Sequence, residues 1–94
     1  MELLSIGETN FIVRNLFFKK EISFGEIEKV VVSNTLSLFD EVAIFIYLPQ
    51  VLLVADSNPE FFNMAEKLKL NDVLGQDWYK RAEQGERFEL RIRV

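Results

Sequence analysis

The stretch VAIFIYLPQVLLVA occupies residues 42–55 and decides the fold. It is almost continuously apolar, yet it is shorter than the roughly 20 residues that a membrane-spanning helix needs. Pro49 and Gln50 interrupt it, and such a short connection makes the flanking runs antiparallel neighbours in a sheet. Because apolar residues occupy successive positions in both runs, the stretch predicts two central strands that are covered on both faces.

Further strands are predicted upstream of this stretch. The candidates share β-branched or aromatic residues and are residues 11–13, 16–18, 22–24 and 27–32. The first two flank Arg14 and Asn15, and Lys19 and Lys20 fit a solvated turn between strands. Up to about residue 56 the chain therefore predicts a meander of four or five strands.

A helical pattern begins after Asp56. Ser57 is a candidate N-cap with Glu60 at the capping-box position, and Asn58 followed by Pro59 is an alternative start one residue later. The apolar stripe of this helix follows helical spacing and comprises Phe61, Ala65 and Leu68, with Phe62 and Met64 beside them. This stripe is expected to cover one side of the sheet.

Two further elements complete the chain. Asn71 and Asp72 are expected to end the first helix, and residues 76–84 predict a shorter helix that Gly85 stops. Trp78 in that helix is expected to lie in the core. Residues 88–94 alternate between apolar and charged side chains, which is typical of a half-buried strand.

Together these elements predict one α+β domain over residues 1–94. Its antiparallel meander sheet has four to six strands, is covered by one or two helices from the C-terminal half, and receives the final strand back into the sheet. No linker, internal repeat or low-complexity tract divides the sequence.

The residue types needed for common catalytic chemistry are missing. The chain has no His and no Cys, which excludes imidazole acid-base chemistry, thiolate metal sites and disulfides. No nucleophile-elbow motif and no glycine-rich phosphate loop occur. We therefore expect no enzymatic activity and no cofactor; an enzyme here would depend on a perturbed carboxylate or Lys.

One acidic segment imitates a calcium loop. Asp56, Asn58 and Glu60 match its first ligands, but Phe61 replaces the turn glycine and Lys67 replaces the final bidentate Glu. A helix cap explains these residues better, so no metal site is predicted.

Charge and composition restrict the partner. Lys and Arg number 11 against 15 Asp and Glu, a net charge of −4 that works against non-specific binding to nucleic acid and favours a basic or neutral partner. The start of the chain lacks the features of a signal peptide, no integral membrane segment is predicted, and the absence of Cys makes a cytoplasmic location the default.

Two features could form an interaction surface. Tyr79 follows Trp78, and amphipathic aromatic residues are enriched at interface hot spots. Arg87, Arg91 and Arg93, with Lys80 and Arg81 nearby, make the C-terminal end locally basic. Outward Arg residues on an edge strand commonly prevent pairing with other molecules, and a surface for phosphate or an acidic partner is the functional alternative.

A family resemblance adds to this pattern. The run ISFGEIEKV over residues 22–30, followed by the strands of residues 42–48 and 51–56 and the helix from Pro59, resembles bacterial PH-like (pleckstrin-homology-like) domains. The resemblance implies a binding scaffold rather than an enzyme, and no ligand residue carries over because no head-group motif matches. Residues 76–94 depart from the PH-like pattern, which leaves open whether the sheet closes into a barrel.

The leading hypothesis is a non-enzymatic module that binds a protein, for example an immunity or antitoxin protein that blocks a basic toxin. A small-ligand carrier or carboxylate-based enzyme is one alternative. Peripheral binding to anionic lipid through Lys19 and Lys20 or the C-terminal Arg residues is another. Self-association through an unpaired edge strand is also open.

Overall fold

The computed structural model describes residues 1–34 and 41–91, which form an α+β fold with two antiparallel sheets. The first sheet has the order β1-β2-β3 and comprises β1 (Glu2–Ile6), β2 (Asn10–Asn15) and β3 (Phe18–Ser23). The second has the order β6-β5-β4-β7 and comprises β4 (Lys29–Ser33), β5 (Ala43–Tyr47), β6 (Val51–Ala55) and β7 (Phe88–Arg91). Helices α1 (Phe61–Lys67), α2 (Leu70–Leu74) and α3 (Trp78–Glu83) connect β6 to β7. The predicted single meander is thus two sheets, and the predicted one or two helices are three short ones.

A short helical turn separates the two sheets. The 3-10 helix η1 (Phe24–Glu26) follows β3 directly, and the Ser23 and Glu26 side chains form a capping box across it. The chain changes direction here, so β4 does not pair with β3 and instead becomes an inner strand of the second sheet. The capping box is the local reason why the meander breaks.

The structure corrects the position of the first hairpin. Asn15 pairs with Phe18, so Leu16 and Phe17 form the two-residue turn, whereas the sequence predicted a strand over residues 16–18. Lys19 and Lys20, expected in a turn, lie in β3. The buried residues of β2 set this register, because a shift by one residue would turn them toward solvent.

The β5–β6 hairpin is covered unequally. Strand β5 is buried on both faces except at Tyr47, as predicted. Strand β6 alternates between exposed and buried side chains, so the prediction of burial on both faces was wrong for it. The reason is its position: among the described strands β6 is an edge strand paired with β5, and the helices cover one face of the second sheet.

The helix boundaries also differ from the prediction. Helix α1 begins at Phe61, and neither predicted N-cap residue caps it. Asn58 instead accepts a bond from the Glu60 backbone N–H at 2.8 Å and donates one to the Leu3 carbonyl at 3.2 Å, which fastens this turn to β1. Lys69, in the left-handed conformation with φ 57°, ends the first helical region before Asn71, so Asn71 and Asp72 lie inside α2.

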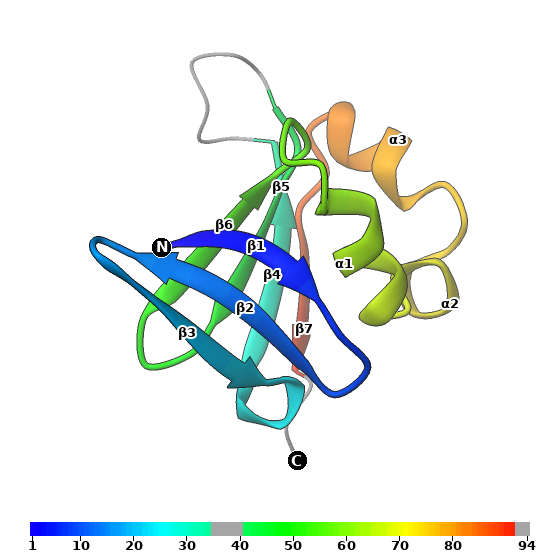
Figure 1. Ribbon diagram of the computed structural model, residues 1–94. Coiled ribbons are helices and arrows are strands. Elements are labelled where there is room, and N and C mark those ends of the chain that lie inside the picture. Colours follow the sequence, from blue (N-terminus) through cyan, green and yellow to red (C-terminus); the bar gives the residue numbers. More distant parts are fainter. Residues whose placement is uncertain (35–40, 92–94) are drawn as a thin grey trace.

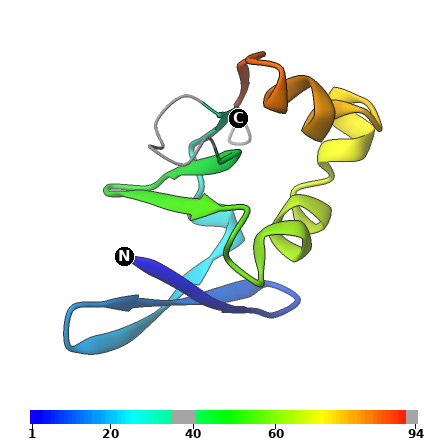
Figure 2. The same ribbon diagram turned by 90° about the horizontal axis from the view of Figure 1, so that it is seen from above.

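One core fills the space between the two sheets and the helices. Figure 1 shows the first sheet crossing the second, with the helices at the other side of the molecule, and Figure 2 shows the same three groups from above. Trp78 lies in this core, as predicted. The largest side chains that are almost completely buried come from all three groups and include Phe11, Ile44, Ile46, Leu52, Phe61, Met64 and Leu70. In the described ranges, no helix is long and apolar enough to cross a membrane.

Candidate functional site

Among the residues that the structure describes, most large apolar side chains that remain exposed lie away from the helices. They come from the N-terminus, the β2–β3 turn and β6, and they are Met1, Leu16, Phe17, Phe18, Val51 and Leu53. Two open cavities connect members of this group, since Met1 lines one cavity together with Leu53 and another together with Phe18. The exposed apolar surface is therefore concentrated along the junction of the two sheets.

Strand β6 contributes the flat part of this surface. Leu52 and Val54 point into the core, which turns Val51 and Leu53 to the opposite face of the sheet, where they are 47% and 45% exposed. Leu53 lies beside Phe45 of β5 in the sheet register, and Val51 lies beside Tyr47. We call this surface, formed by Phe45, Tyr47, Val51 and Leu53, the β6 face.

The backbone edge of β6 carries none of the charges or bulges that commonly protect edge strands, although β1 packs close to β6. Its sequence VLLVA contains no charged residue, whereas the edge strands β1, β3 and β7 carry charged residues, and β1 also has a register shift near Leu3. Charges and bulges on edge strands hinder pairing with other chains. Among the described strands, β6 is thus the edge best suited to receive another strand.

An open cavity of about 490 Å³ lies between β6 and β1. Leu53 and Ala55 of β6 line it, together with residues 1–4 at the start of the chain and the segment from Ser57 to Glu60. The cavity places both apolar side chains and backbone of an edge strand within reach of a bound segment.

Tyr79 is held by contacts inside the domain. Its hydroxyl donates a hydrogen bond to Asp56 at 2.7 Å, and the same carboxylate oxygen accepts the Val42 backbone N–H at 3.2 Å. The ring packs against Phe61 and Trp78. The hydrogen bond to Asp56, together with burial, raises the pKa of Tyr79 to about 12 from its ordinary value of 10.0. Tyr79 thus ties α3 to the end of β6.

This contact predicts a stability difference that depends on pH. The raised pKa means that the protonated hydroxyl is favoured in the folded state, so its contribution is complete below about pH 10 and disappears as the pH rises through about 12. Tyr79→Phe is expected to lower the free energy of unfolding by about 1–2 kcal/mol near pH 8. Chemical denaturation of both proteins at neutral and high pH measures this; an equal difference at both pH values would contradict the contact.

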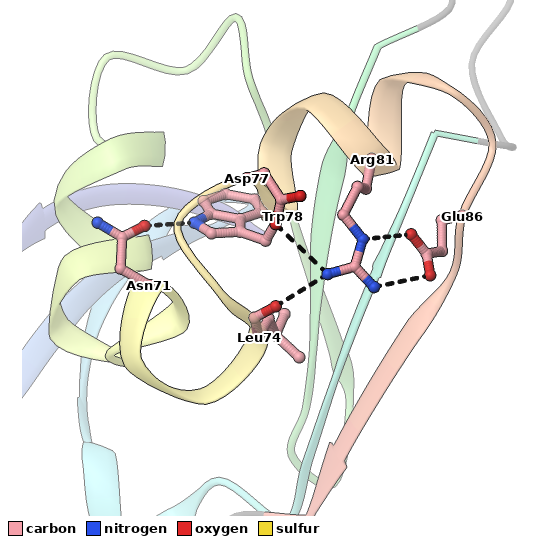
Figure 3. Close-up of polar contacts among 6 residues, drawn as sticks. All are labelled: Asn71, Leu74, Asp77, Trp78, Arg81 and Glu86. Carbon is pink, nitrogen blue, oxygen red and sulfur yellow. Dashed lines mark hydrogen bonds and ion pairs between the residues drawn. The ribbon is translucent and has the colours of Figure 1, made fainter.

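A second polar network joins α2, α3 and the segment before β7 (Figure 3). Arg81 donates two hydrogen bonds to Glu86, at 2.7 and 2.9 Å, and one to the Leu74 carbonyl at 3.1 Å. Trp78 donates its indole N–H to Asn71 at 2.8 Å. The hydrogen bonds from Arg81 lower the pKa of Glu86. Arg81 belongs to the basic C-terminal region of the sequence. Its guanidinium group is therefore paired with groups of the domain itself.

The predicted interaction residues that the structure describes have different neighbours. Tyr79 packs among the helices, whereas Arg91 is the last residue of β7 and lies beside Lys29 of β4 in the sheet register. Arg87 forms an ion pair with Glu89 at 3.4 Å. Arg93 lies outside the described residues. Tyr79, Arg87 and Arg91 are thus held by separate sets of contacts.

The acidic residues in the described ranges do not gather into a metal site. Within the part of the chain that the structure describes, no group of three or more metal-ligating side chains occurs, and every buried polar side chain has a hydrogen-bond partner. In the segment that resembles a calcium loop, Asp56 accepts a hydrogen bond from Tyr79 and Asn58 donates one to the Leu3 carbonyl.

Comparisons with known proteins add no relative. No family model, curated protein or solved structure matches the chain. The β6 face therefore has to be interpreted from its own geometry. Sequence analysis missed it because the alternation of burial in β6 depends on which neighbours cover the sheet; the absence of charge in residues 51–55 was the one signal available.

Proposed function

We propose that this domain is a non-enzymatic protein-binding module and that the β6 face is its contact surface. The observation that supports this is an uncharged edge strand with two half-exposed apolar side chains beside an open cavity. Exposed apolar patches on a folded domain commonly mark interaction sites. An extended segment of the partner would add to β6 through backbone hydrogen bonds and place alternate side chains near Val51 and Leu53.

The fold arrangement is consistent with this role. We propose a distant PH-like relationship, supported by the run of residues 22–30 that leads into β4 and by helix α1 following β6. The return of β7 beside β4 is a departure from that pattern. An immunity or antitoxin protein is one form of the proposal, because a net charge of −4 favours a basic protein as the partner.

Charge substitutions on the β6 face test the proposal. The wild-type domain is first used to isolate its protein partner. The double variant Val51→Lys and Leu53→Lys is expected to bind that partner about 10-fold or more weakly, because both charged side chains would have to be desolvated in the complex. Both positions are about half exposed, so the temperature of thermal unfolding should change little.

Phe62→Lys is the matched control, because Phe62 is an exposed apolar residue of α1, in the helix layer. This variant is expected to retain the wild-type affinity in isothermal titration calorimetry. Unchanged affinity of the β6 double variant, or loss of binding only in the Phe62 variant, would reject the β6 face.

A further inference from the structure

The β2–β3 turn exposes its most apolar residues. Leu16 and Phe17 form the turn and are 82% and 96% exposed, and Phe18 next to them is 59% exposed. Leu16 adopts φ 53°, a left-handed conformation that glycine adopts without strain. A polar turn that begins with glycine would be favoured both by water and by the backbone. Folding alone therefore gives no reason for these side chains.

Positive charge surrounds this apolar turn. Residues 13–20 contain Arg14, Lys19 and Lys20 and no acidic residue, whereas the remainder of the chain has eight Lys and Arg against fifteen Asp and Glu. Arg14 forms a long ion pair with Glu2 at 3.9 Å. In the described ranges no acidic side chain pairs with Lys19 or Lys20. Glu21 follows Lys20 directly and lies on the same face of the strand as Lys19, and its carboxylate accepts a hydrogen bond from Asn10 at 3.1 Å.

The two Lys residues flank the turn on both faces of the hairpin. Successive side chains of a strand alternate between faces, so Lys20 lies on the same face as the buried Ile22, and Lys19 lies on the opposite face beside Arg14. A headgroup layer surrounds an inserted turn on all sides, and it would contact both Lys side chains at once. The pocket of a protein partner gives no comparable reason for cations on both faces.

The turn also projects from the body of the domain. Both views show it at the opposite end from the helices (Figures 1 and 2). The acidic excess thus lies behind a basic, apolar tip, and this distribution of charge would orient the tip toward a negatively charged surface. A convex tip of this kind can enter a lipid interface without a preformed pocket.

We propose that the β2–β3 turn anchors the domain to anionic membranes. Leu16 and Phe17 enter the boundary between headgroups and acyl chains, and Lys19 and Lys20 contact the anionic headgroups. The proposal is independent of the protein-binding function, because it uses the turn and leaves the β6 face free.

Vesicle co-sedimentation of the full chain tests the anchor. Wild-type protein is expected to bind vesicles of phosphatidylcholine and phosphatidylglycerol at low salt and to bind pure phosphatidylcholine vesicles much less. The double variant Leu16→Gly and Phe17→Ser is expected to lower the partition coefficient by about 100-fold, since two large apolar side chains no longer transfer from water. It should unfold at the wild-type temperature or above, because glycine relieves the strained φ.

Two additional variants separate charge from insertion. Lys19→Gln with Lys20→Gln is expected to lower binding to the anionic vesicles by about 10-fold or more and to leave binding to neutral vesicles unchanged. Phe17→Trp is expected to show a blue shift of fluorescence when anionic vesicles are added, over the constant signal of the buried Trp78.

Each outcome decides the proposal. Binding that both double variants reduce, together with the blue shift, supports it. Absence of binding at low salt overturns it, as does undiminished binding of the Gly-Ser variant or equal binding to neutral and anionic vesicles. Loss of a protein partner in the Gly-Ser variant, without any vesicle binding, would also overturn it and assign the turn to a protein contact.

Discussion

Phe61→Ala is expected to lower the free energy of unfolding by about 3–5 kcal/mol, the largest single effect that the structure predicts. Phe61 is fully buried at the start of α1, and its ring contacts Trp78 and Tyr79 of α3. Removal of the ring leaves a cavity where α1 and α3 meet over the second sheet. For a domain whose total stability is about 5–15 kcal/mol, much of the folded population would be lost.

Phe62→Ala provides the control, because Phe62 is the adjacent residue and is 56% exposed. It is expected to change the free energy of unfolding by less than about 1 kcal/mol. Urea denaturation followed by circular dichroism measures both variants. Similar losses for the two substitutions would mean that α1 does not pack through Phe61.

Gly75→Ala is expected to lower the free energy of unfolding by about 2 kcal/mol or more. Gly75 connects α2 to α3 with φ 100° and ψ 156°, a backbone conformation that is essentially restricted to glycine. A methyl group there would also lie 3.2 Å from the Asp77 carboxylate. Because both the backbone conformation and the nearby carboxylate disfavour a side chain at this position, the turn between the two helices would have to rearrange.

Gly25→Ala serves as its comparison. Gly25 has no positive φ, and an added methyl group would make only an ordinary contact of 3.5 Å with Ser23. Its free energy of unfolding should stay within about 0.5–1 kcal/mol of the wild-type value. Denaturation curves that rank Gly25→Ala as the more harmful substitution would be inconsistent with the left-handed connection at Gly75.

Much of the secondary structure follows from local pattern. The apolar stretch of residues 42–55 forms the β5–β6 hairpin, and the alternation after residue 87 forms β7. The division into two sheets does not follow from periodicity, because it depends on the capping box at η1 and on which strands meet in space. Single-strand patterns carry no information about those long-range pairings.

The surfaces were harder to predict than the strands. An apolar triplet such as Leu16, Phe17 and Phe18 is typical of a strand, and only the pairing of Asn15 with Phe18 shows that it includes the turn. Arg81 looked like part of a basic surface, yet Glu86 and the Leu74 carbonyl occupy its guanidinium group. The use of a charged or apolar side chain is decided by its spatial neighbours, which the sequence does not specify.

The most direct test of the β6 face is site-specific photo-cross-linking in living cells. A photoreactive amino acid at position 53 is expected to capture one protein partner, and the same amino acid at the exposed position 80 in α3 should capture none. Capture of the same proteins at both positions, or no capture at position 53 while the domain still isolates its partner, would contradict the proposal that this face is the binding surface.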